Sequence, residues 1–403
     1  MRRFNDLAVP GLGGVWFGKQ IFLALLGVAV AEYVRARGNS PAIRKISNIE
    51  VTNAVEALAC WMAYRENGWT PDPRLRGITK LRGWHSITFQ QARQPGCYVT
   101  QPMRMATVQT LPALGLVETD SVRFNHFHCS DKGRDFLELA TAPFRPYKKD
   151  VQDCLQDWIL ENSALKGNSP PLVASLSPLS PLAERARQML RRQFLLNGRD
   201  ADAERRSQAL AWVEMLHTER EWSWERKPVQ LSEAHWHDLQ AGARFFALRE
   251  AAITVLDELE SHMGAMAYPS LNLSDLSDLT KSPPCDLEPL REAAQQYLAM
   301  EREDEDAHVF ARECRGGDIV RSLVRRDGQV LQLRGERIIP GPAFRGSPQR
   351  LGNDTDEEDG PQPAAVPLPP HISSRVRNLW LLHHDMAGDL GVLLSSGQEK
   401  DKA

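Results

Sequence analysis

Apolar residues near the start of the chain recur with the spacing of α-helices. The segment Val15–Arg37 is mostly apolar, and Gly38-Asn39-Ser40-Pro41 after it forms a strong helix stop. Residues 51–62 place an apolar side chain at every third or fourth position. The pattern therefore predicts two helices, the second of which has Asn48 or Thr52 as its N-cap.

The second half of the chain carries further helical periodicity, separated by Ser/Pro-rich connectors. The longest stripe includes Leu239, Phe246 and Ile253. The pattern predicts helices at Asp150–Asn162, Pro181–Leu196, Asp202–Trp224, Ser232–His262 and Leu287–Asp304. The fold class predicted from these elements is mainly α.

Two segments indicate small β-hairpins. Residues 117–129 alternate weakly around a turn at Asp120-Ser121. Within residues 319–339, two β-like runs flank Asp327-Gly328, a dipeptide typical of tight hairpin turns. We therefore predict one hairpin in the first half and a second one near the C-terminal end.

The end of the chain combines an acidic, Pro-rich stretch with a helical stripe. Residues 346–370 contain the acidic cluster Asp354–Asp359 and a Pro/Ala run, a composition typical of disorder. Helical spacing returns at Ile372–Leu394. Two interpretations stay open: the terminal helix docks on a partner protein, or it folds back onto its own core.

Residues 100–140 hold the pattern that bears most on function. A helix is predicted from Thr100 to Leu114, with Pro102 in its first turn and Pro112 as an expected kink. The hairpin follows, and Ser130 then caps another helix. The outward-facing candidates of the first helix are polar or basic, as base-reading side chains are: Thr100, Gln101, Arg104, Thr107, Gln109 and Thr110.

Two short phrases in this region support a family resemblance. They are L-x-x-L-G-L-V-E at Leu111–Glu118 and C-S-D-K-G-R-D-F-L-E at Cys129–Glu138. Over residues 46–141 the chain resembles winged-helix regulators of the MarR/PadR kind. The resemblance implies a recognition helix that carries Gln101 and Arg104, and a wing that carries Arg123.

The wing departs from that family in its charge, because His126 and His128 stand where Lys or Arg is often found. Winged helices also bind proteins, so a protein contact stays open beside the DNA contact. With this resemblance, the predicted organisation is an N-terminal apolar helix segment at 1–45, a winged-helix domain at 46–147, a helical domain at 148–315, a β-hairpin at 316–345, an acidic linker at 346–370 and a C-terminal docking helix at 371–395.

Charge is distributed unevenly along a chain whose net charge is only −3. Residues 1–150 hold 20 Lys/Arg and 12 Asp/Glu, whereas the remainder is acidic. A basic front half can attract phosphate. A second basic group beside Trp84 can track a nucleic-acid backbone, or can simply be a charged loop. The predicted DNA-binding residues are Thr100, Gln101, Arg104, Thr107, Arg123, Arg74, Arg76, Lys80 and Arg82.

Other chemistry has weak support in the sequence. Residues 13–20 fit a phosphate-loop pattern but place Gln20 where Ser or Thr is needed, and His126-x-His128 lacks a second metal-ligand pair. The six cysteines are scattered, and the longest apolar run, Ile21–Ala31, is too short to span a membrane. No cofactor, metal or membrane partner is predicted, and we expect a cytoplasmic location.

Together these patterns predict a non-enzymatic subunit that binds or loads DNA within a multi-component bacterial assembly, in genome maintenance or defence against foreign DNA. The expected partners are double-stranded DNA and other protein subunits, an ATPase among the candidates, and a homo-oligomer stays open. The sequence is also compatible with a kleisin-like scaffold whose winged helix and terminal helix bind proteins. A winged-helix transcription regulator and an enzyme with an unrecognised active site stay open as well.

Overall fold

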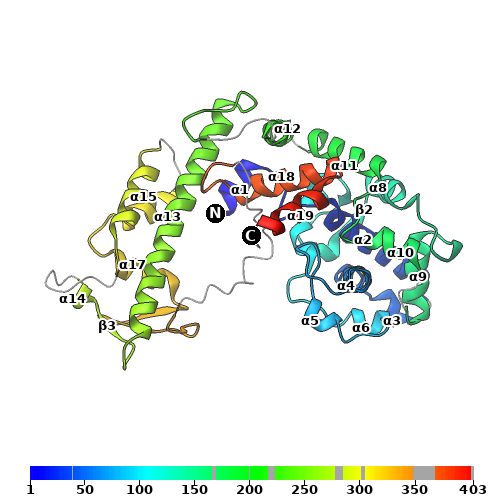
Figure 1. Ribbon diagram of the computed structural model, residues 1–403, viewed down its shortest axis with the longest axis horizontal. Helices are drawn as coiled ribbons and strands as arrows, with labels where there is room; N and C mark the ends of the chain where they lie inside the picture. Colours follow the sequence, from blue (N-terminus) through cyan, green and yellow to red (C-terminus); the bar gives the residue numbers. More distant parts are fainter. Residues whose placement is uncertain are drawn as a thin grey trace. The chain divides into compact units, whose positions relative to one another are not determined.

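The computed structural model describes residues 1–38, 40–165, 169–198, 200–216, 223–276, 285–300, 305–347 and 368–400. Within them the protein is mainly helical, with one sheet of two strands and one of three (Figure 1). The predicted mainly-α class is therefore confirmed. None of the described helices has both the length and the apolar character needed to cross a bilayer.

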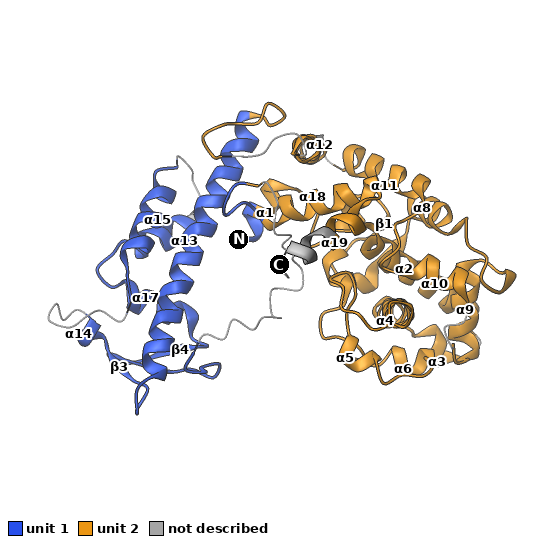
Figure 2. Cartoon of the chain, in the orientation of Figure 1, with its two compact units in different colours: residues 1–4, 233–355, 369–373 blue, residues 5–232, 356–368, 374–403 orange. Residues whose placement is uncertain are grey.

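The chain divides into two compact units (Figure 2). Unit 1 comprises Met1–Phe4, Glu233–Thr355 and Pro369–Ser373. Unit 2 comprises Asn5–Ser232, Asp356–Leu368 and Ser374–Ala403. Both units are therefore built from segments that are distant in the sequence.

Helix α2 (Gly18–Arg37) is the centre of unit 2. Its residues from Gly18 to Ala31 are all buried, so the helix is enclosed by other elements over this length, and all of these residues except Lys19 and Gln20 are apolar or glycine. Helix α4 (Asn48–Glu66) crosses it so closely that a Cβ on Gly27 would lie 2.2 Å from the Thr52 hydroxyl oxygen. Glycine at position 27 therefore sets the distance between the two central helices.

The remaining elements of unit 2 surround this pair. In chain order they are α1 (Arg2–Ala8, continuing from unit 1), α3 (Pro41–Arg44), α5 (Ile78–Leu81), α6 (Phe89–Ala92), η1 (Met103–Thr107), α7 (Thr110–Ala113), β1 (Val117–Glu118), η2 (Phe124–His126), β2 (His128–Cys129), α8 (Asp131–Thr141), η3 (Pro146–Lys148), α9 (Val151–Glu161), α10 (Pro170–Leu176), α11 (Glu184–Leu196), α12 (Asp200–Met215), α18 (Ser374–Ala387) and α19 (Leu390–Lys400).

The cap of α4 differs from both sequence candidates. Ser47 accepts the Glu50 N–H at 3.2 Å, and the Glu50 carboxylate accepts the Ser47 N–H at 2.8 Å. This reciprocal capping box satisfies two helix-end donors, which neither Asn48 nor Thr52 can do without a glutamate three residues later. The Asn48 amide instead donates to the Phe124 and Phe127 carbonyls.

Unit 1 is organised around the 32-residue helix α13 (Glu233–Gly264). Its apolar face packs in one cluster with the neighbouring helices and a three-stranded antiparallel sheet. These elements are β3 (Leu271–Asn272), α14 (Leu273–Leu276), α15 (Glu288–Leu298), α16 (Glu305–Glu313), α17 (Ile319–Asp327), β4 (Leu331–Arg334) and β5 (Arg337–Pro340).

The hairpin of unit 1 exists, but its turn does not lie at Asp327-Gly328 as predicted. Gly328 is the C-cap of α17, with φ +59°, and its N–H donates to the Val324 carbonyl. The turn lies at Gly335-Glu336, between β4 and β5. The apolar residues before Asp327 are buried with helical spacing on one face, so they form α17 rather than a strand.

The terminal helix folds back within its own unit, which is one of the two interpretations open from the sequence. Val376, Leu379 and Leu381 of α18 have no exposed surface, and the helix packs against α2, α11 and α12. The predicted acidic cluster Asp354–Asp359 lies outside the described residues.

Candidate nucleic-acid interface

The segment predicted as one recognition helix, Thr100–Leu114, forms two short pieces. The 3₁₀ helix η1 ends at Thr107 and the single turn α7 begins at Thr110. The predicted continuous helix is therefore wrong. Pro112 explains part of the break, because it has no N–H to donate to the Val108 carbonyl.

Much of this segment is covered by other parts of unit 2. The Gly14 N–H donates to the Ala106 carbonyl at 3.2 Å, and the Thr110 hydroxyl donates to the Leu12 carbonyl at 2.6 Å. The Gln109 side chain accepts a hydrogen bond from Arg375 of α18 at 2.7 Å. Because these neighbours occupy one side of η1 and α7, that side cannot enter a DNA groove in this arrangement.

Arg104 is engaged with the core rather than projecting freely. Its Nε donates to Asn53 at 2.7 Å, and its backbone N–H donates to the Glu56 carboxylate at 2.7 Å. Glu56 is fully buried, and burial raises the pKa of its carboxyl, while the nearby Arg104 acts in the opposite direction. Arg104 therefore helps to hold a buried carboxylate in place. An effect of an Arg104 substitution on DNA binding would have to be distinguished from the loss of this structural role.

The other predicted residues of this segment have different surroundings. Thr107 is buried and its hydroxyl donates to the Arg104 carbonyl at 2.8 Å. Thr100 and Gln101 are exposed. The Gln101 carbonyl accepts a hydrogen bond from Arg76 at 2.7 Å, so the structure brings these two predicted residues together.

The segment predicted as the wing is a short hairpin whose strands pair antiparallel, with Val117 opposite Cys129. Between the strands the chain forms η2, and Arg123 just before it is exposed. Ser130 caps α8 by accepting the Gly133 N–H at 3.0 Å, as the sequence predicts. A Cβ at Gly133 would lie 2.2 Å from the Leu116 carbonyl oxygen, so glycine lets α8 approach the wing.

The four cations of the predicted basic loop differ in exposure. Three of them, Arg74, Lys80 and Arg82, differ also in whether a carboxylate pairs with their charge. Arg74 is mostly buried, forms an ion pair with Asp72 at 2.8 Å, and donates to the Leu179 carbonyl. Lys80 is exposed and donates to the Gly96 carbonyl at 2.7 Å. Arg82 is also exposed, at 3.4 Å from the Trp69 carbonyl oxygen and over the Trp69 ring. Carbonyl partners leave the charge of Lys80 and Arg82 uncancelled at these contacts.

The stretch of sequence that contains these cations lacks acidic residues, a feature that no motif reveals. Between Asp72 and Glu118 the chain contains no Asp or Glu at all. The exposed neutral residues of this stretch are mostly hydrogen-bonding ones: Thr79, His85, Gln90, Gln91, Gln94, Thr100 and Gln101. The spacing of carboxylates along the sequence, rather than a helical pattern, identifies this stretch. Carboxylates from outside it pair with Arg93 (Glu50) and with Arg74 (Asp72), neither of which is fully exposed. We define the carboxylate-free face as the exposed residues of 73–117.

Other candidate chemistry takes the following positions. Lys19 of the phosphate-loop pattern is buried and donates to the Ser175 carbonyl. His126 lies 3.7 Å from Asp120, and His128 lies 3.1 Å from Glu32. No group of three or more metal-ligating side chains forms in the part of the chain that the structure describes.

Comparison of the chain with protein-family models, curated proteins and solved structures gives no match. The winged-helix resemblance therefore depends on the two sequence phrases alone, because the helix expected before the hairpin is replaced by η1 and the single turn α7.

Proposed function

We propose that this chain is a non-enzymatic DNA-binding subunit of a multi-component assembly, and that it contacts the phosphate backbone of a duplex. The contacts are made by Lys80 and Arg82 on the carboxylate-free face, together with Arg123 before η2 in the wing. Base reading by a recognition helix is not part of the proposal, because one side of η1 and α7 is covered.

The observation that carries the proposal is the electrostatic character of the carboxylate-free face. Lys80 and Arg82 are exposed, and their hydrogen bonds go to carbonyl oxygens rather than to carboxylates. Phosphate contacts of this kind release condensed counterions and give sequence-independent affinity. The neighbouring glutamine and threonine side chains can add hydrogen bonds to phosphate or sugar oxygens.

The test is the salt dependence of duplex binding, measured by fluorescence anisotropy of a labelled duplex with the full chain. Each lost phosphate contact lowers the slope of log K against log salt by about 0.9. We expect the double variant Lys80→Gln/Arg82→Gln to bind more weakly and with a slope smaller by about 1.8.

The matched control is Arg192→Gln, an exposed arginine of α11 that lies far along the sequence from this face. It should leave both affinity and slope unchanged. Equal losses in the control and the double variant would show that binding reflects overall charge only. Absence of duplex binding by the wild type at low salt would remove the proposed function.

A further inference from the structure

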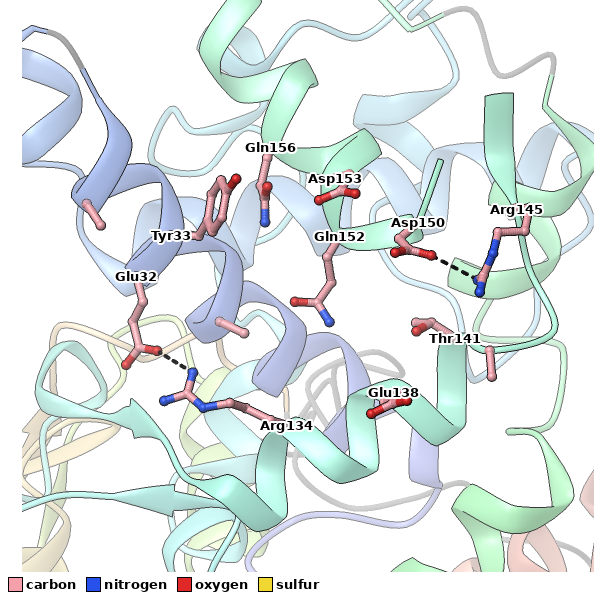
Figure 3. A pocket seen from close by; sticks show the side chains of 13 residues that line it. Glu32, Tyr33, Arg134, Glu138, Thr141, Arg145, Asp150, Gln152, Asp153 and Gln156 are labelled. Atoms are coloured by element: carbon pink, nitrogen blue, oxygen red, sulfur yellow. Dashed lines mark ion pairs between the residues drawn. The ribbon is translucent and has the colours of Figure 1, made fainter. Parts of the chain in front are cut away.

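Unit 2 contains a polar cavity of about 690 Å³ between α2, α8 and α9 (Figure 3). This volume lies within the range of small-molecule sites. Most such sites are apolar, whereas this one is lined largely by charged and amide side chains. Its polar lining residues are Glu32, Tyr33, Arg134, Glu138, Thr141, Arg145, Asp150, Gln152, Asp153 and Gln156.

Two carboxylates that line the cavity are not part of its ion pairs. Arg134 lies 3.7 Å from Glu32, and Arg145 lies 3.0 Å from Asp150. Figure 3 marks both ion pairs with dashed lines. Glu138 of α8 and Asp153 of α9 have no ion pair or side-chain hydrogen bond with any described residue. The cavity therefore carries an excess of negative charge that comes from two different helices.

Gln156 adds an independent sign that the cavity accommodates a ligand. The residue is only 6% exposed, and its side chain points from α9 toward the space beside Tyr33 and Gln152 (Figure 3). Its amide has no hydrogen-bond partner among the described residues. The amide nitrogen and oxygen are not among the described side-chain atoms that are both buried and unpartnered, so they face the open space of the cavity and are accessible to a hydrogen-bonding group there.

We propose that this cavity binds a small organic cation with two or more amino groups joined by a flexible chain, the chemistry of a linear polyamine. Separate ammonium groups would contact Glu138 and Asp153, and an N–H would donate to the Gln156 amide oxygen. The methylene chain would lie along Ala29, Ala36 and the Tyr33 ring, which are among the apolar groups of the lining.

The arrangement of the carboxylates favours this ligand class over a metal ion. A metal needs its ligands gathered around one point, and no group of three or more metal-ligating side chains is present among the described residues. Because the two carboxylates lie on separate helices, they can each contact a different ammonium group of a ligand whose charges are separated by methylene groups. Excess negative charge also disfavours anionic ligands.

The experiment is calorimetric titration of the full chain with spermidine in the absence of nucleic acid, so its outcome is independent of the proposed DNA contact. We expect saturable binding of one spermidine per chain. Glu138→Gln and Asp153→Asn should each weaken binding about tenfold or more, because each variant removes one charge-assisted contact to an ammonium group. Gln156→Leu should weaken it as well, with a smaller change.

The control variant is Asp135→Asn, which removes an exposed carboxylate from α8 that does not line the cavity. It should bind spermidine like the wild type, and 1,6-hexanediol should not bind at all. If no saturable binding occurs, or if Asp135→Asn weakens binding as much as Glu138→Gln, the proposal is wrong. Circular dichroism of each variant checks that the fold is retained.

Discussion

At the scale of single residues, the least expected finding is that two ionisable side chains are buried near the start of α2. Lys19 and Asp385 are both buried, and Asp385 accepts the Gly18 N–H at 2.8 Å. Burial lowers the pKa of Lys19 to about 7, with the Asp385 charge acting in the opposite direction. Burial also raises the pKa of Asp385. The sequence shows Lys19 only as part of a phosphate-loop pattern, because its burial depends on a helix near the other end of the chain.

The lowered pKa of Lys19 predicts how stability changes with pH. Between about pH 7 and the unfolded pKa of 10.5, the unfolded chain holds a proton on this amine that the folded chain has released. The free energy of unfolding should therefore rise with pH across this window, by up to about 1.4 kcal/mol per pH unit. Other groups titrate in the same range, so the variant Lys19→Met provides the reference.

The measurement is urea unfolding of the wild type and Lys19→Met at several pH values from about 7 to about 10. The difference in free energy, wild type minus variant, should increase with pH. A difference that stays constant would show that Lys19 remains protonated throughout this range and that its pKa is not lowered.

At the scale of elements, hydrophobic periodicity predicted long helices well, but it predicted short segments that contain Gly or Pro poorly. The predicted helix at 232–262 is observed as α13, because its apolar stripe extends over many turns. The turn predicted at Asp327-Gly328 is wrong, since a glycine with positive φ serves equally as a hairpin turn or as a helix C-cap. The buried face of α17 decides between the two, and burial is a tertiary property.

The C-cap assignment predicts a specific cost of substitution. Gly328→Ala should destabilise the protein by about 1–2 kcal/mol, because a Cβ is strained in the left-handed conformation even where no neighbour obstructs it. The control is Gly317→Ala, which also meets no neighbouring atom and has no left-handed φ. Thermal unfolding would compare the two, and an equal effect at both positions would refute the C-cap assignment.

At the scale of the molecule, unit 2 is closed by the C-terminal part of the chain. Arg375 of α18 donates to the Val9 carbonyl and to the Gln109 side chain, and forms an ion pair with Asp6 at 2.5 Å. The amphipathic stripe of this helix is visible in the sequence. Its partner surface is not, because periodicity along a segment says nothing about contacts hundreds of residues away.

The two interpretations of the terminal helix therefore differ in a measurable quantity. If α18 belongs to the core, Leu379→Ala removes a side chain with no exposed surface and should lower the free energy of unfolding by about 2–5 kcal/mol. Val392→Ala on α19 is the matched control, because Val392 is 74% exposed and its loss should change stability by less than about 0.5 kcal/mol. Urea unfolding of both variants gives the comparison. If neither substitution changes the free energy of unfolding, α18 leaves the core readily and the docking interpretation is restored. A large loss of stability confined to Leu379→Ala would instead show that the C-terminal segment stabilises the unit that carries the carboxylate-free face.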